Sequence, residues 1–328
     1  MSDEVVSGRM EPDAIDTVAR PHEAGLQTGV PSGHRGARTD ELGAGRLVTS
    51  ESIAAALKIP VSGSLFDLDP GRFNGMPRDP LSPPFQMVTY RTPHGIRVQG
   101  DVTYLQAEVN PTGTAWIDEL MIGTVHCGAH IDALSHVTRG APGEWHDGFS
   151  ADEDLGDFGP LKADASKIPP IIARGVLIDV AGSRGEPELP EGYEIRAKDL
   201  EEALTQQGTV LRQGDVILVR TGQMRRWPDE IDFSRKAPGV VLEAAQLMSS
   251  AGPLAVGSDT SGFETREARG GLPNTVHMHL LVDRGIYIME WLYLEDLART
   301  STHEFLFIAL PLKIQGATGS WIRPVCIA

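Results

Sequence analysis

The sequence predicts an α/β fold built around a mixed sheet, and two patterns lead to this prediction. Beyond residue 170, apolar runs of strand length alternate with amphipathic stretches of helix length. Glycine and proline stand at the ends of these stretches, where helices stop and turns begin. Strands that alternate with helices along a chain favour a sheet covered by helices.

The expected elements can be placed along the chain in order. A short helix is expected at 50–59, and a strand pair at 97–108 within a Pro- and Gly-rich region of long loops. The runs ARGVLIDVA and GDVILVRTG are apolar throughout, as in buried strands. Strands are expected at 173–181, 214–222, 253–259, 285–294, 304–312 and 320–328, and helices at 197–208, 238–252 and 276–285.

Residues 1–47 differ in composition from the rest of the chain. They mix Gly, Pro, Asp, Glu and Arg without apolar periodicity, which is typical of a poorly ordered extension. An arm that docks on a partner subunit is the alternative. Residues 48–328 are expected to form one domain, and a chain that starts near Ser50 is expected to keep its catalytic activity.

Composition favours an acidic soluble enzyme. The 328 residues include 29 Lys and Arg against 45 Asp and Glu, so the net charge is −16. This balance argues against nucleic-acid or anionic-membrane partners, which attract clustered basic residues. No apolar stretch approaches the ~20 residues that cross a bilayer, and the N-terminus has no apolar signal region. Two cysteines fit a reducing cytoplasm and require no disulfide framework.

Three of the ten histidines fall within one short segment, HCGAHIDALSH, together with an aspartate. His130 and Asp132 are two residues apart and share a face of an extended segment. His136 follows Asp132 by four residues, so a helical turn returns it to the same side. Imidazole and carboxylate ligands must reach an ion at ~2.0–2.2 Å. The segment therefore predicts a Zn²⁺ or Mn²⁺ site that includes His126, His130 and Asp132.

A second cluster, HMHLLVDRGIYIME, lies near the C-terminus. Glu290 ends an apolar run, and a charge in such a run is costly unless it is paired or bound to metal. His277 and His279 precede the run, and each is a candidate ligand. An edge strand with Glu290 facing water is the alternative.

At these residues the chain resembles the cyclase family of metal-dependent hydrolases, which includes kynurenine formamidase and isatin hydrolase. GTVHCGAHIDALSH is similar to the family signature at His126, His130, Asp132 and His136, with Ala129 in place of the usual Thr and Leu134 in place of Pro. The second cluster is similar to a later family stretch, with the best fit at His277 and Glu290. The resemblance covers roughly residues 50–328.

The resemblance implies a swivelling β/β/α fold, a homo-oligomer (a dimer or a dimer of dimers) and one or two divalent ions. It assigns His126, His130 and Asp132 to the first ion. Asp132 then bridges to a second ion held by His136, His277 and Glu290. In members with one ion, the residue at the position of His136 resembles the catalytic acid and base instead.

The chemistry implied is hydrolysis of a C–N amide bond in a small cyclic amide or imide, or in an N-formyl aryl amine. Metal-activated water is the nucleophile in such a reaction. The aromatic residues Phe66, Phe73 and Phe85 of the long loops are candidates to cover a flat substrate, with loop packing as the alternative. An Fe(II) oxygenase with a two-histidine, one-carboxylate triad and a non-catalytic metal-binding protein are the competing interpretations.

Overall fold

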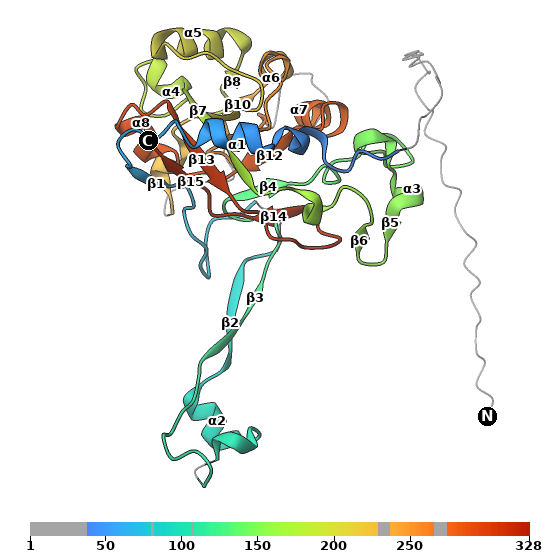
Figure 1. Cartoon of the computed structure of the whole chain (residues 1–328), viewed down its shortest axis with the longest axis vertical. Coiled ribbons are helices and arrows are strands. Elements are labelled where there is room, and N and C mark those ends of the chain that lie inside the picture. The colour runs from blue at the N-terminus through green and yellow to red at the C-terminus, as the bar shows by residue number, and fades with distance from the viewer. Residues whose placement is uncertain (1–37, 80–81, 107, 229–236, 266–273) are drawn as a thin grey trace, which may run out of the picture. The chain divides into compact units, whose positions relative to one another are not determined.

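A nine-stranded mixed sheet forms the centre of the computed structural model (Figure 1). The model describes residues 38–79, 82–106, 108–228, 237–265 and 274–328. In hydrogen-bonded order the strands are β1 (Leu65–Asp67), β15 (Val325–Ile327), β13 (Glu304–Ala309), β7 (Ile171–Asp179), β9 (Val216–Arg220), β11 (Ala255–Ser258), β12 (Tyr287–Glu290), β4 (His130–Asp132) and β14 (Gly319–Trp321).

The four central strands β7, β9, β11 and β12 run parallel, and the strands on both sides of them are antiparallel. Parallel strands are covered on both faces, so their sequences read as unbroken apolar runs. Every residue of β9, β11 and β12 is accordingly buried. The expected α/β fold with a mixed sheet is confirmed.

Helices α5, α6 and η6 form a row over one part of the sheet, with α7 leading directly into η6 (Figure 1). Helix α5 ends where the sequence predicts, at Gly208 with φ +65°. The α-helices are α1 (Ser50–Ala56), α2 (Pro93–Gln99), α3 (Ala151–Asp154), α4 (Val180–Ser183), α5 (Ala197–Gln207), α6 (Leu242–Ser250), α7 (Thr275–His277) and α8 (Glu295–Arg299). The other helical turns are η1 (Gly43–Leu47), η2 (Thr103–Leu105), η3 (His146–Gly148), η4 (Ala165–Lys167), η5 (Gln223–Arg226) and the π-helix η6 (Met278–Asp283).

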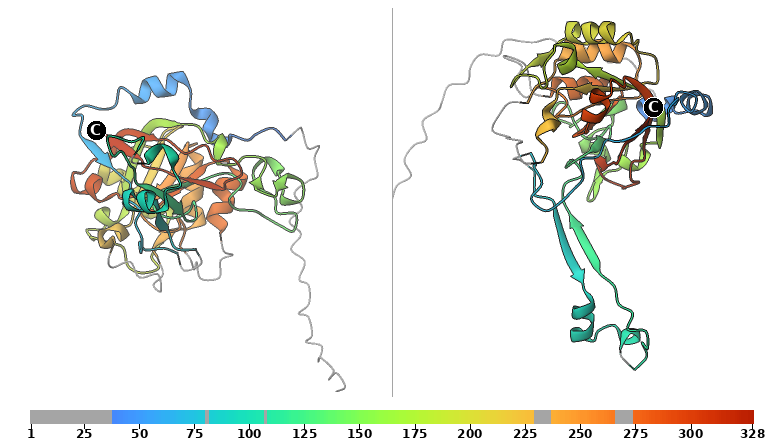
Figure 2. Two further views of the ribbon diagram at one scale, coloured as in Figure 1. Left: turned by 90° about the horizontal axis from the view of Figure 1, so that it is seen from below. Right: turned by 90° about the vertical axis from the view of Figure 1, so that its left-hand side faces the viewer.

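Three two-stranded sheets complete the fold. They are β2 (Gln86–Arg91) with β3 (Asp118–Ile122), β5 (Leu155–Gly156) with β6 (Gly159–Pro160), and β8 (Glu194–Ile195) with β10 (Gly239–Val240). The ribbon of β2 and β3 stands away from the nine-stranded sheet and carries α2 at its far end (Figure 2). We call residues 86–122 the arm.

The expected strand pair at 97–108 is wrong. Helix α2 occupies the first part of this range and the turn η2 the second. The local signals are those of a helix: the Thr92 side chain accepts a hydrogen bond from the Gly95 amide, Pro93 follows, and Gly100 ends the helix with φ +60°. The strands β2 and β3 lie on either side of this range and pair with each other, so residues 97–108 belong to the connection between them.

Residues 38–47 belong to the same unit as the sheet, Arg38–Ala328, whereas residues 1–37 of the expected extension lie outside the described residues. The Ala44 amide donates to the Gly285 carbonyl at 2.7 Å, and the Tyr287 hydroxyl donates to the Leu42 carbonyl at 2.7 Å. Gly43 has φ +49°, and a Cβ there would lie 2.3 Å from the Gly285 oxygen. This segment therefore packs on the start of β12.

No helix in the described ranges has the length and apolar character needed to span a membrane.

Removing residues 38–47 is expected to destabilise the fold. A chain that starts at Val48 loses the partner of the Tyr287 hydroxyl, and an unsatisfied buried polar group costs about 1–3 kcal/mol. We expect a lower free energy of unfolding, measured by urea titration, than for a chain that starts at Arg38. Equal values for the two truncated chains would contradict this prediction.

Candidate metal centre

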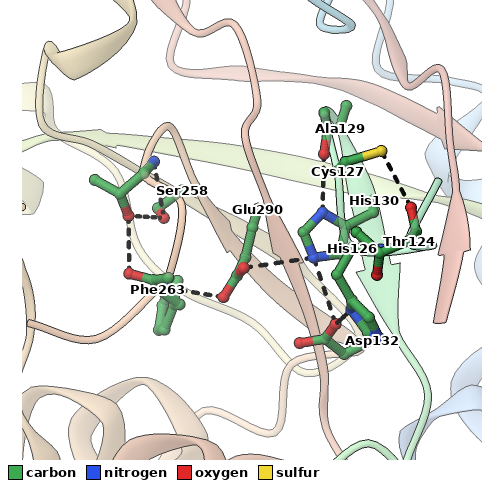
Figure 3. A network of polar contacts seen from close by, with 12 residues as sticks. Thr124, His126, Cys127, Ala129, His130, Asp132, Ser258, Phe263 and Glu290 are labelled. Carbon is green, nitrogen blue, oxygen red and sulfur yellow. Dashed lines mark hydrogen bonds and ion pairs between the residues drawn. The ribbon is translucent and has the colours of Figure 1, made fainter. Parts of the chain in front are cut away.

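Strand β4 brings the centre of the histidine motif into the sheet. His130 and Asp132 are its first and last residues, so both side chains lie on one face. Strand β12 pairs with β4 in a register that sets Glu290 opposite His130. Directly opposed residues share a face of the sheet, and Figure 3 shows the Glu290 carboxylate pointing toward the His130 ring. All three side chains are buried.

The predicted ligands form two groups that share one carboxylate. His126, His130 and Asp132 make up the first group, and Asp132, His277 and Glu290 the second. Within each group the candidate ligand atoms lie within 4.8 Å of one another. In the second group, His277 Nε2 is 3.2 Å from Glu290 Oε1 and 3.9 Å from Asp132 Oδ2. The fold therefore joins residues 126–132 to residues 277–290.

His126 precedes β4 and is held by a residue that the sequence did not indicate. Its Nδ1 lies 2.9 Å from Asp132 Oδ1, while its Nε2 lies 3.0 Å from the Thr318 hydroxyl. The next residue, Gly319, must lack a side chain, because a Cβ there would be 2.8 Å from the His126 ring. Thr318 and Gly319 reach this place through the pairing of β14 with β4, which no local sequence signal predicts.

Two of the atoms that converge on the centre are hydrogen-bond acceptors without a donor. His130 donates through Nδ1 to the Gly128 carbonyl at 2.8 Å. In the neutral ring the other nitrogen, Nε2, then carries no proton and is an acceptor. Among the described residues, His130 Nε2 and Asp132 Oδ2 are buried without a hydrogen-bond partner. The carboxylate oxygens nearest to this Nε2 belong to Asp132, at 3.5 Å, and Glu290, at 3.4 Å. Converging imidazole and carboxylate acceptors fit a divalent cation.

Arg72 supports the loop between His126 and His130 from behind. Its guanidinium donates to the Cys127 and Ala129 carbonyls and pairs with Asp69. Gly128 adopts φ +63° against this side chain, so the chain turns sharply between the two histidines. Cys127 is buried beside Phe85 and packs there as a small apolar residue.

The pKa values of the buried carboxylates depend on the histidines beside them. Burial by itself raises the pKa of Asp132, but its interactions with His136, His126 and His130 outweigh burial and hold that pKa below its usual value. Burial also raises the pKa of Glu290, and the contacts with His130 and His277 reverse the shift. Buried carboxylates of this kind require a cation nearby, either imidazolium or metal.

His136 lies beside the two groups without belonging to either. Its ring stacks on His126 with centroids 3.9 Å apart and an interplanar angle of 26°. Burial, together with the charges of His126 and His277, lowers the pKa of His136 to about 4, so this imidazole is neutral at neutral pH. His279 points elsewhere, with its Nε2 2.8 Å from the Ser249 hydroxyl on α6. His277 is thus the histidine of the second cluster that reaches the centre.

The three candidate phenylalanines lie in different surroundings. Phe66 is in β1 opposite Cys326 and packs on the main core. Phe85 is buried against Trp321, with ring centroids 5.7 Å apart. Phe73 is 39% exposed and meets Trp227 edge to face at 6.0 Å.

Trp227 in turn contacts Trp291, the residue after Glu290, with ring centroids 5.7 Å apart. Phe73 therefore belongs to an aromatic row that ends next to a candidate ligand. The two tryptophans of this row were not among the aromatic residues expected from the sequence.

The family model described as "Putative cyclase" matches residues 75–265, more than half of the chain, and the chain belongs to the cyclase family. The resemblance seen in the motifs is therefore confirmed. No curated protein matched the chain.

Solved structures of the same family share the fold. A crystal structure of a cyclase is 27% identical, covers 89% of this chain and 95% of its own, and superposes with a TM-score of 0.78. Isatin hydrolase A from Ralstonia solanacearum is 21% identical, with coverages of 85% and 97% and a TM-score of 0.58. Isatin hydrolase A from Labrenzia aggregata, bound to benzyl benzoate, is 20% identical, with coverages of 80% and 93% and a TM-score of 0.57.

Removing one histidine of the first group is expected to weaken metal binding. Loss of a residue that only orients a ligand costs about 10–100-fold in affinity, so His130→Ala should cost at least as much. The measurement is Zn²⁺ and Mn²⁺ titration by calorimetry, with His94→Ala on the exposed surface of α2 as the matched control. A variant His130→Ala that binds metal as tightly as the unaltered chain would refute the site.

Proposed function

We propose that this chain is a metal-dependent hydrolase that cleaves a C–N amide bond of a small cyclic amide or imide, or of an N-formyl aryl amine. The observation that carries the proposal is the pair of ligand groups joined through Asp132, with a neutral histidine beside them. A Zn²⁺ or Mn²⁺ ion bound there supplies acidified water and polarises a carbonyl oxygen. His126, His130 and Asp132 would hold one ion, and Asp132, His277 and Glu290 a second.

His136 is assigned the proton transfer. A buried imidazole that is neutral at neutral pH accepts a proton through a ring nitrogen, and the same nitrogen returns the proton to the leaving amine. Its position outside both ligand groups favours this role over the sequence-based assignment as a ligand of the second ion. Stacking on His126 keeps the ring beside the first group.

The aromatic row Phe73, Trp227 and Trp291 is proposed to receive the flat part of the substrate. Phe73 is partly exposed at one end, and Trp291 follows Glu290 at the other. Aromatic side chains bind planar ligands by offset or edge-to-face contact. This arrangement supports a small aryl or cyclic substrate over a peptide.

The competing interpretations explain less of the site. A two-histidine, one-carboxylate oxygenase triad uses three residues and leaves the remaining members of the two groups without a role. A purely structural metal site is closed to water. The His126 side chain is 18% exposed, so the first group meets solvent. The cytoplasmic location expected from the composition stays a prediction.

Substitution of His136 tests the mechanism. We expect His136→Ala to retain its metal content and to lose about 10²–10⁴-fold in kcat, the usual contribution of a positioned acid–base group. Turnover should be measured on isatin-like imides, lactams and formanilides, and metal content by mass spectrometry. Added imidazole should restore part of the rate. If His136→Ala instead loses an ion together with its activity, His136 is a ligand.

We further propose that the chain forms a homo-oligomer through the arm. Of the 23 large apolar residues that are exposed in the described parts of the chain, ten lie within residues 86–122. Each face of the ribbon carries an apolar pair: Met87 pairs with Met121 on one face, and Val88 pairs with Leu120 on the other. A two-stranded ribbon is marginal alone and needs further packing.

A second copy of the chain is the occupant that fits this ribbon. In a two-fold interface each copy supplies both the inserted element and the surface that receives it. The same chain carries a cavity of about 410 Å³ whose lining is mostly apolar, with Ile308, Leu310, Leu312, Trp321, Ile322 and Val325 beside the charged residues Asp69, Arg72 and Arg323. Leu310 and Leu312 are more than half exposed, so this cavity presents apolar surface that an arm can cover.

The double variant Leu120→Asp, Met121→Asp is expected to release monomers. It places one charge on each face of the ribbon, and burying an unpaired charge in an interface costs several kcal/mol. Sedimentation equilibrium gives the mass, with Val61→Asp, at a position 95% exposed outside the arm, as the control. A monomeric unaltered chain, or a double variant of unchanged mass, would rule out this interface.

A further inference from the structure

Glu264 is a buried carboxylate that belongs to neither ligand group, yet it contacts one of the candidate ligands directly. Its Oε1 lies 2.8 Å from His277 Nδ1, and its Oε2 accepts a hydrogen bond from the Val276 amide at 2.8 Å. The side chain is only 11% exposed. Because the Val276 amide occupies one oxygen at the start of α7, the other oxygen is left for the imidazole.

The backbone around Glu264 is fixed against β10. Val240 donates to the Phe263 carbonyl at 3.1 Å, and the Thr265 amide donates to the Val240 carbonyl at 3.3 Å, which is a parallel bridge. Gly239 allows this approach, since a Cβ there would lie 2.3 Å from the Thr265 nitrogen. Residues 263–265 therefore extend the β8–β10 pair by one short segment.

The same segment also holds the second ligand of the group. The Phe263 amide donates to Glu290 Oε1 at 2.9 Å, as Figure 3 shows. Two consecutive residues thus contact both His277 and Glu290, one through its backbone and the other through its side chain. The third member of the group, Asp132, comes from β4 instead.

The two groups orient their histidines in chemically different ways. In the first group His130 Nδ1 donates to a backbone carbonyl, that of Gly128. In the second group His277 Nδ1 faces a carboxylate. A carboxylate partner fixes the ring and makes the opposite nitrogen a stronger donor to metal than a carbonyl partner does.

We propose that Glu264 is a positioning residue for the second ion, because it holds the Nδ1 proton of His277 and so turns Nε2 toward Asp132 and Glu290. This inference rests on the proposed metal-dependent function. It predicts that loss of Glu264 weakens the second ion selectively, because His126 and His130 do not contact it.

The test is calorimetric titration of the full chain with Mn²⁺, comparing the unaltered chain with Glu264→Ala and Glu264→Gln. We expect two ions per unaltered chain. In Glu264→Ala the second ion should bind about 10–100-fold more weakly, as is typical when an orienting partner is removed. The first ion should bind with unchanged affinity. Glu264→Gln keeps one acceptor oxygen, so its affinity for the second ion should lie between that of the unaltered chain and that of Glu264→Ala. Glu243→Gln, an exposed glutamate on α6, is the matched control.

The outcomes separate this inference from the function on which it rests. Unchanged binding of both ions in both variants, or equal weakening of both ions, overturns the role of Glu264. An unaltered chain that binds no ion overturns the proposed function itself, and one that binds a single ion overturns the second site. If Glu264→Ala does not fold, as judged by circular dichroism, the Glu264→Gln titration decides between these outcomes.

Discussion

The pairing of β4 between β12 and β14 is the constraint on which the centre depends. It sets buried carboxylates and imidazole acceptors on one face of the sheet, at positions that water does not reach freely. Charges of one sign that are brought together away from solvent raise the energy of the fold unless positive charge lies between them. The buried carboxylates on β4 and on its neighbour β12 therefore fit a site for positive charge, which imidazolium or a metal cation can supply.

The residues around the strand keep its ligands in place, and each does so by a different physical means. Arg72 donates charged hydrogen bonds to carbonyl oxygens of the loop between His126 and His130. The Thr318 hydroxyl contacts the His126 ring, and Gly319 leaves room for that ring because it has no side chain. These contacts come from segments far apart in the sequence. The sheet order brings them together, so the precision of the centre is a property of the whole fold rather than of the motif.

The sequence predicted the parts that depend on local periodicity and spacing. Apolar runs located the central strands, and the interval between His130 and Asp132 implied a shared face. The arm was misplaced because apolar residues occur on both faces of its ribbon, so it lacks the alternation that marks a half-buried strand. Glu264, Thr318 and Arg72 are single polar residues whose roles arise from long-range pairing. Spacing along the chain contains no information about such pairing, and the motifs that carried the resemblance do not include these positions.

One carboxylate serves both ligand groups, and this has a thermodynamic consequence. Negative charge that Asp132 gives to one cation is no longer fully available to the other, and the two cations repel each other. Occupancy of either position therefore opposes occupancy of its neighbour, and by linkage the opposition is equal in both directions. A chain that binds both proposed ions would pass through a half-loaded form as the free metal concentration rises. The supply of metal, as well as the amount of protein, would then set how much of the population carries two ions.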